Sequence, residues 1–486
     1  MKRKYLLTLL ISLIITSLSG QNVKAYLNYA VFNTPDNQPY VETYMNVNGS
    51  SLHYQPVADG QWQGQLNVQV IFSLNDSIVD FAKYSLKSPL VADTLNRTNL
   101  LDVQRYALPQ GVFNMHLSLV DNGSPADTIS SLAEIIVDFP LQEMEFSDIE
   151  LLQDFQKGGE GAMAKNGYTL TPYVFNYYPE GESQLSFYAE LYHSHTVLET
   201  QPFLITYFIR PFEVDKKLDE YYKMKKVDSD PVKVIMSSFD ISKLPSGNYL
   251  LVMEARDKSN QLITSKELFF QRYNPSMQFN LNNLMVLNTD NTFVGQINNR
   301  DTLLQYIKYL NPISTDVERQ YVQSQLLTGD LSSMQKYFLN FWMERNKLNP
   351  SLAWDEYHLL VKQANHNFKS ISLQGYETDR GRVYLQYGQP SVISENYNEP
   401  AAYPYEIWQY YQLGDQRDKK FVFYAHDIVT NDFQLIHSNA VGELSNYRWQ
   451  TIIYRRTWDP YGIDDDVIPD TYGSGATQNY RQPGSR

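Results

Sequence analysis

The sequence of 486 residues predicts a multidomain chain in which two tandem all-β immunoglobulin-like sandwiches are followed by an α+β domain. The first observation is a repeat. The pattern L-P-x-G-x-aromatic, then alternating apolar residues and a closing Asp, occurs at residues 108–121 and again at 244–257. The second is a change of apolar period from two to that of a helix after Pro275. The third is an abundance of aromatic residues, 38 Tyr and 23 Phe, which suit half-buried strand surfaces.

The N-terminus has the pattern of a secretory signal peptide over residues 1–20. It contains the three expected parts in order: a basic start (2–4), an apolar core (6–15) and a small-residue cleavage zone (17–20). The apolar run is too short to span a bilayer comfortably. We expect cleavage before Gln21, with Ala25 as a second possible site. The mature protein is then exported, periplasmic or associated with the outer membrane, and has no transmembrane segment.

The sequence contains no cysteine. A bacterial lipoprotein needs a cysteine at its cleavage site, so we expect no lipid anchor of that kind. Disulfides, thiolate catalysis and cysteine zinc sites are excluded as well. The formal charge is −14 and becomes −17 when the three basic residues of the signal are lost. Because no basic run of five or more residues occurs, nucleic acid is a poor candidate partner.

The first sandwich is expected at residues 21–140. In its copy of the repeat, Pro109 and Gly111 form a turn, and Phe113 starts a strand whose alternate residues face a core. Such a turn and strand near the end of a domain is common in immunoglobulin-like sandwiches. The predicted strands are residues 25–32, 40–47, 66–74, 112–120 and 133–139.

The second sandwich is expected at residues 141–275. Its copy of the repeat predicts that Leu244 and Leu108 are both buried, and that Tyr249 and Phe113 take equivalent core positions. The predicted strands are residues 168–175, 184–191, 203–209, 232–236 and 249–254.

The α+β domain is expected at residues 276–460. Helical spacing of apolar residues predicts three helices, around residues 303–310, 334–342 and 354–368. Asn349 is expected to cap the third helix, with Pro350 at its first position and Asp355 in its first turn. Short strands are predicted at residues 382–387, 405–411, 421–424 and 433–437. Residues 461–486 show no periodicity and are expected to form a mostly disordered tail.

The most informative segment is residues 375–390, which read G-Y-E-T-D-R-G-R-V-Y-L-Q-Y-G-Q-P. Together with F-W-M-E-R-N at 341–346 and Y-E-I-W at 405–408, it resembles the signature of the GWxTD family, envelope proteins of Bacteroidetes-type bacteria. Tyr376 stands where the Trp of the family's name usually stands. The matching positions, with a structural or binding role, are Gly375, Tyr376, Thr378, Asp379, Arg380, Gly381, Arg382, Tyr384, Gly388, Pro390, Trp342, Arg345 and Trp408.

The charged residues of this motif have two interpretations. In one, Asp379 acts as a base or ligand and an arginine holds an anion. In the other, Thr378 or Asp379 caps a turn, and Arg380 or Arg382 pairs with a carboxylate such as Asp379, Glu377 or Glu344. The glycines and the proline of the motif favour this second, scaffold role. A deep pocket with Asp379 at its wall would favour the first.

Other polar clusters are weaker candidates. His193 and His195 could face one way on a strand, but two histidines alone make a poor metal site. His426, Asp427, Asp432 and His437 cluster near the last predicted strands, where the aspartates look like turn residues. Four Asp-Ser/Thr-apolar triplets, at Asp76, Asp93, Asp127 and Asp301, resemble O-glycosylation sites. We expect no metal, no cofactor and no catalytic residue among these groups.

The sequence therefore predicts an exported, non-enzymatic envelope protein that binds a component of the cell envelope or of a secretion machinery. The alternative is a hydrolase acting on an envelope polymer or peptide, with Asp379 and Glu377 in a cleft of the C-terminal domain. The standard signatures of P-loop, dinucleotide-binding, zincin and serine-hydrolase sites do not occur in the sequence.

Overall fold

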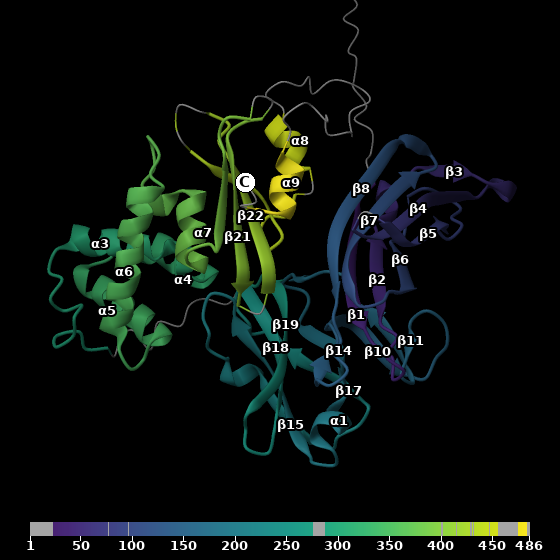
Figure 1. Cartoon of the computed structure of the whole chain (residues 1–486), viewed down its shortest axis with the longest axis horizontal. Coiled ribbons are helices and arrows are strands. Elements are labelled where there is room, and N and C mark those ends of the chain that lie inside the picture. The colour runs from purple at the N-terminus through teal and green to yellow at the C-terminus, as the bar shows by residue number, and fades with distance from the viewer. Residues whose placement is uncertain are drawn as a thin grey trace, which may run out of the picture. The chain divides into compact units, whose positions relative to one another are not determined.

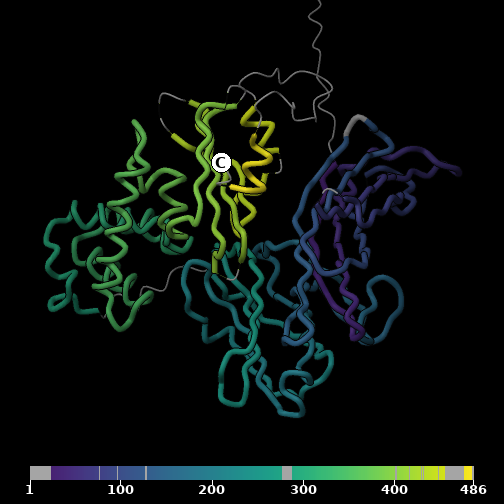
Figure 2. The backbone as a smooth tube through the Cα atoms, in the orientation of Figure 1, coloured from purple at the N-terminus to yellow at the C-terminus, as the bar shows by residue number. Residues whose placement is uncertain are grey.

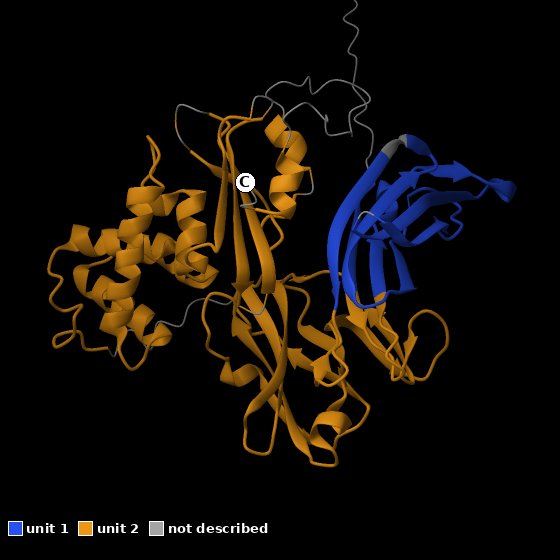
Figure 3. Cartoon of the chain, viewed as in Figure 1, with its two compact units in different colours: residues 1–29, 42–137 blue, residues 30–41, 138–486 orange. Residues whose placement is uncertain are grey.

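The computed structural model describes residues 23–75, 77–95, 97–275, 287–399, 402–414, 416–427, 430, 432–446, 448–454 and 475–483. The expected signal peptide lies outside these residues. The chain divides into two compact units, one of residues 1–29 and 42–137 and the other of residues 30–41 and 138–486 (Figure 3).

The first unit is all β. One sheet has the order β1-β2-β6, and the other has the order β3-β4-β7-β8 with β5 paired to β4. The strands are β1 (Ala25–Phe32), β2 (Tyr40–Val47), β3 (Tyr54–Pro56), β4 (Trp62–Leu74), β5 (Ser77–Lys87), β6 (Leu100–Ala107), β7 (Gly111–Asp121) and β8 (Ser124–Val137), with short 3₁₀ turns at Gly49–Ser51 and Ala58–Gly60.

Strand β4 shows why these segments form strands. The burial of its side chains alternates, so that Leu66, Val68, Val70 and Phe72 point into the core and are at most 4% exposed, while the residues between them, Asn67, Gln69 and Ile71, are only partly buried. The register to β7 continues this alternation, since Val68 lies opposite the buried Leu119.

The second unit begins with another pair of sheets. One has the order β11-β12-β10-β14-β17 with β9 paired to β14, and the other has the order β13-β19-β18-β15-β16. The elements are β9 (Glu145–Phe146), β10 (Glu150–Lys157), β11 (Ala164–Lys165), β12 (Tyr168–Pro172), β13 (Tyr177–Tyr178), β14 (Gln184–Tyr192), α1 (Ser194–Leu198), β15 (Phe203–Pro211), a 3₁₀ turn (Asp219–Tyr221), β16 (Tyr222–Val227), β17 (Val232–Asp240), β18 (Gly247–Arg256) and β19 (Leu262–Arg272).

The burial predicted from the repeat is confirmed. Leu108 and Leu244 are 1% and 0% exposed, and Phe113 and Tyr249 are 0% and 5% exposed. The two repeat strands, β7 and β18, each lie between an earlier strand and the strand that follows them in the chain. In the second copy the Tyr249 hydroxyl donates to the Pro245 carbonyl at 3.0 Å, the tyrosine-to-upstream-backbone bond found at corners of immunoglobulin-like sandwiches.

The remainder of the second unit is α+β. It contains α3 (Arg300–Tyr309), a 3₁₀ turn (Asn311–Ile313), α4 (Asp316–Tyr321), a π turn (Val322–Leu326), α5 (Leu331–Arg345), α6 (Pro350–Asn367), a 3₁₀ turn (Gly375–Glu377), α7 (Asp379–Tyr387), β20 (Val392–Asn396), β21 (Tyr405–Leu413), β22 (Gln416–Tyr424), β23 (Gln434–Ser438), α8 (Trp449–Tyr454) and α9 (Ala476–Arg481).

A four-stranded antiparallel sheet, β20-β21-β22-β23, forms the centre of this region. Helix α7 and the other helices from α3 to α6 lie on one side of β21 and β22, and α8 with α9 lies on the other (Figures 1 and 2). The alternation of β21 decides what each side contacts. Trp408 and Tyr410 belong to the core shared with the helices before the sheet, whereas Tyr405 and Ile407 belong to the core shared with α8 and α9.

One expectation for this region is wrong, and a second, the mostly disordered tail at residues 461–486, falls largely outside the described residues. Residues 382–387 form part of helix α7 and not a strand, because Thr378 caps the helix start and Gly388, at φ 82°, ends it. Residues 475–483, expected within the disordered tail, include helix α9, which is held because Ala476 packs in the core of α8 and the Asn479 amide donates to the Tyr405 hydroxyl. The three helices predicted before the sheet correspond to α3, α5 and α6, and Asn349 caps α6 as expected, although Asp355 lies beyond its first turn.

Candidate functional site

The segment before α7 folds by tight backbone packing. A Cβ on Gly375 would lie 1.9 Å from the Ala364 carbonyl oxygen in α6, and one on Gly381 would lie 1.7 Å from the Gly375 carbonyl oxygen. The Thr378 hydroxyl donates to the Gly375 carbonyl and accepts from the Gly381 amide, at 2.8 and 3.1 Å. These glycines are therefore required by close contact between backbones, as the scaffold interpretation expects.

Tyr376 anchors the same segment on the helical core. Its ring meets Tyr309 edge to face at 4.9 Å and is 6% exposed. Its hydroxyl donates to Glu377, and burial together with that carboxylate raises the pKa of Tyr376 to about 12. Glu377 itself accepts from the Gln374 amide, so both side chains serve the local turn.

Arg380 points from α7 to the sheet. Its Nη1 donates to Glu406 Oε1 of β21 at 2.7 Å, and the two side chains are only 7% and 4% exposed. The guanidinium also lies 4.1 Å from the centre of the Phe433 ring, a favourable cation–π position. The expected pairing of Arg380 with a carboxylate is found, but the partner is Glu406 and none of the three carboxylates named from the sequence.

Glu406 is held by three donors. Besides Arg380, the Tyr397 hydroxyl donates to Oε1 at 2.6 Å and the Trp408 indole donates to Oε2 at 2.9 Å. Burial and the neighbouring carboxylate raise the pKa of Tyr397 far above its ordinary value, so this hydroxyl stays protonated. Arg380, Glu406, Tyr397 and Trp408 thus form a rigid polar cluster, called the floor below, in which the charges of Arg380 and Glu406 compensate each other.

This floor lies beneath an open cavity of about 930 Å³. Its wall combines the end of α6, one side of α7 and strand β20, with four amide side chains among the lining residues: Gln363, Asn367, Gln389 and Asn398. Four residues of the matched motif line it, namely Arg380, Tyr384, Pro390 and Trp408. The volume is in the range of small-ligand pockets.

The other charged motif residues lie elsewhere. Asp379 accepts from the Leu435 amide at 2.8 Å and does not line the cavity. Arg382 makes a two-pronged contact with Glu443, at 2.7 and 2.8 Å, again a carboxylate that the sequence did not indicate.

Trp342 and Arg345 are parts of the helical core. Trp342 is 3% exposed and packs on Trp354, with ring centres 5.8 Å apart. Arg345 makes a two-pronged contact with Glu318 at 3.0 and 2.9 Å, and its guanidinium lies over the Phe341 ring at 3.4 Å. Neither residue reaches the cavity.

The comparisons with known proteins identify this region. Residues 273–455 match the family model described as GWxTD domain. This chain carries a GWxTD domain. Among solved structures, the chain is similar to the fibronectin(III)-like modules of Clostridium thermocellum CbhA, with 12% identity, a TM-score of 0.15, and coverage of 50% of this chain and 89% of that chain. No curated protein matches.

Within the GWxTD domain, sequence reasoning missed most of the cavity. Glu406 stands in the Y-E-I-W motif but carried no assigned role, and Glu395, Tyr397 and Asn367 carried none. A charged residue between the apolar residues of a predicted strand was the available signal for Glu406, because such a residue needs a buried partner.

The histidine clusters do not assemble a metal site. His193 adopts a left-handed backbone at the start of α1, and its ring contacts the Glu143 carbonyl and Asn37. In the GWxTD domain, His437 accepts from the Asn446 amide and stacks on Trp449, and burial lowers its pKa to about 4. Among the described residues, no group of three His, Cys, Asp or Glu side chains is placed to hold a metal ion.

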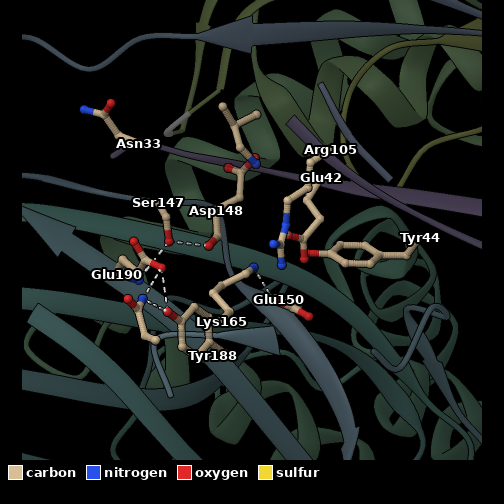
Figure 4. A network of polar contacts seen from close by, with 12 residues as sticks. Asn33, Glu42, Tyr44, Arg105, Ser147, Asp148, Glu150, Lys165, Tyr188 and Glu190 are labelled. Atoms are coloured by element: carbon tan, nitrogen blue, oxygen red, sulfur yellow. Dashed lines mark hydrogen bonds and ion pairs between the residues drawn. The ribbon is translucent and has the colours of Figure 1, made fainter. Parts of the chain in front are cut away.

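A second buried polar cluster fastens residues 30–41 to the second sandwich (Figure 4). Lys165 pairs with Glu150 at 2.9 Å, both at most 5% exposed, and its ammonium lies 3.6 Å from the centre of the Phe32 ring. Nearby, Glu190 accepts from the Tyr188 hydroxyl at 2.5 Å. These bonds connect neighbouring side chains to one another. In the first unit, Glu42 pairs separately with Arg105.

Proposed function

We propose that this chain is an exported, non-enzymatic protein of the cell envelope, in which the GWxTD domain binds a ligand in its cavity. The two sandwiches serve as spacer and docking surfaces that hold this domain at the periplasmic or outer-membrane surface. Its partner is a component of the envelope or of a secretion machinery. The basic-apolar-small pattern of residues 1–20 supports export. Among the described residues, no helix is long and apolar enough to cross a membrane.

The main support for a binding function is the cavity above the Arg380–Glu406 pair. Its floor is fixed before any ligand arrives, because every oxygen of Glu406 already accepts a hydrogen bond. A fixed floor lowers the entropy lost on binding. The wall offers amides and aromatic rings, which recognise polar groups without chemical change.

The hydrolase alternative is not supported by the positions of its residues. It requires Asp379 and Glu377 in a cleft, but Asp379 binds the Leu435 amide and Glu377 the Gln374 amide. Glu406, the carboxylate at the cavity floor, is committed to three donors and to a buried arginine, which leaves it a poor general base.

The test combines fractionation with blocking of the cavity. Asn367 ends α6 and lines the cavity, so Asn367→Trp fills it, whereas Lys362→Trp on the exposed side of the same helix is the matched control. Tagged proteins are purified from cross-linked envelopes of native host cells, and the partners are identified by mass.

We expect the mature protein in the envelope fraction without lipid, with partners that the parent and Lys362→Trp share and Asn367→Trp loses. An uncleaved N-terminus in the cytosol would contradict export. An identical partner set in all three proteins would contradict binding through the cavity.

A further inference from the structure

We propose that the ligand of the GWxTD domain is an extended polypeptide segment that adds as a fifth strand beside β20 and presents a Lys or Arg side chain to Glu395. This inference rests on the proposed binding function and names the class of ligand. It follows from three properties of β20: an open edge, a side that faces the cavity, and a single uncompensated charge.

Strand β20 stands at the end of its sheet. It pairs with β21 only, and within the described part of the chain no other strand pairs with it. The Gln409 carbonyl of β21 accepts from the Ser391 amide, so the backbone polar groups of Gln409 point towards β20. Val392 lies opposite Gln409 in the register, so its own N–H and C=O groups point towards β21. In an antiparallel ladder the direction alternates along a strand, so the N–H and C=O groups of Ile393 and Glu395 point away from β21. An open edge of this kind is a template for an added strand.

The same residues direct their side chains towards the cavity. Ile393 lies opposite Trp408 and Glu395 lies opposite Glu406 in the register, and all four line the cavity. Residues opposite each other in a sheet share a face. A segment added to β20 therefore places every second side chain over the cavity, while its main chain bonds the strand edge.

The charges select a basic segment. Three charged residues line the cavity, and Arg380 and Glu406 form one buried pair. Glu395 remains exposed beside them, so the cavity carries one net negative charge. The formal charge of −14 on the whole chain has the same sign and favours the approach of a cation. The amides of Gln363 and Asn367 add donors and acceptors suited to peptide groups.

The first experiment measures binding to defined peptides. Fluorescein-labelled octapeptides of alternating Val and Thr, with one central Lys, Gln or Glu, are titrated with the mature full-length protein and followed by anisotropy. We expect the Lys peptide to bind roughly two- to fivefold more tightly than the Gln peptide, and the Glu peptide to bind weakest. Glu395→Lys should reverse this order, because it changes the sign of the selecting charge.

The second experiment tests the strand edge. Ile393→Pro removes one outward N–H but none that bonds β21, which is the position where an edge strand tolerates proline. It should abolish binding of every peptide without shifting the urea midpoint. A Lys peptide that is N-methylated at alternate amides should also fail to bind, and this arm does not depend on the folding of any variant.

Two results would overturn the inference. Equal binding of methylated and unmethylated peptides would exclude pairing with the edge. No binding of any peptide, while Asn367→Trp still removes a partner from envelopes, would exclude a polypeptide ligand but leave the binding function intact; neutral oligosaccharides of the envelope would then be the ligand class to test.

Discussion

Replacing Glu406 with glutamine tests whether the buried pair holds the GWxTD domain together. The substitution keeps the size of the side chain and removes its charge, which leaves the Arg380 guanidinium, 7% exposed, without its carboxylate. Breaking a buried pair from one side costs about 3–5 kcal/mol. A typical domain has a free energy of unfolding of about 5–15 kcal/mol, so the loss should be large relative to the total.

The assay is urea unfolding of the full chain followed by tryptophan fluorescence. Five of the six tryptophans lie after residue 340, so the signal reports mainly on the GWxTD domain. The matched control is Glu344→Gln, which removes the carboxylate of an ion pair with Lys216 whose side chains are 43% and 56% exposed. Because exposed pairs contribute about 0–1 kcal/mol, this control should unfold nearly as the parent does.

The single variant Arg380→Met and the double variant Arg380→Met with Glu406→Gln complete a double-mutant cycle. Since removal of both charges leaves no uncompensated ion, the double variant should be less destabilised than the sum of the two single variants. The reasoning would be refuted if Glu406→Gln unfolds within about 0.5 kcal/mol of the parent, as an ordinary surface substitution does, or if the two single effects simply add.

Three further predictions concern stability. Gly381→Ala should lower the free energy of unfolding by at least about 2 kcal/mol, because its Cβ would collide with the Gly375 carbonyl. The control is Gly181→Ala, whose Cβ meets no atom within 4 Å and which should change the free energy of unfolding little. Equal effects of the two substitutions in urea unfolding would contradict the packing argument. His437 has a folded pKa of about 4 against an ordinary 6.5, so the unfolded chain gains the proton first and stability should fall as pH drops from about 6.5 to 4, by up to about 3 kcal/mol. His437→Phe, whose ring still stacks on Trp449, should flatten that part of the pH profile, and an unchanged slope would show that another group is responsible. Glu213 is shifted in the other direction, because burial raises its pKa to about 7 from 4.5. The folded state therefore keeps the Glu213 proton to a higher pH than the unfolded chain does, and stability should decrease as pH rises from 4.5 to 7. Glu213→Gln should stabilise the protein by up to about 3 kcal/mol above pH 7 and have no effect below pH 4.5. A destabilised variant at neutral pH would show that the carboxylate is needed.

The error at residues 382–387 shows where local patterns fail. Val383, Leu385 and Tyr387 alternate as in a strand, but the buried residues Val383 and Tyr384 also fit a helix face. The deciding signals were at the ends, since Thr378 caps the helix and Gly388 follows it with a positive φ of 82°, which favours glycine. A short segment with both periods is assigned correctly only when its caps are considered.

The sequence alone determined the layout of this protein. The two sandwiches followed by an α+β region, the buried repeat positions Leu108 and Leu244, and the GWxTD motif are all properties of local pattern, because apolar period and turn residues act within a few positions. Only the tertiary structure decided which charged side chains pair with each other and which elements line the cavity. Arg380 reaches Glu406 across 26 residues, Arg382 reaches Glu443 across 61, and the cavity combines helix α6 with strand β20. No local spacing encodes such distant contacts, since they depend on how α7 packs against the sheet. The close backbone contacts at Gly375 and Gly381 hold the turn before α7 against helix α6 and against α7 itself.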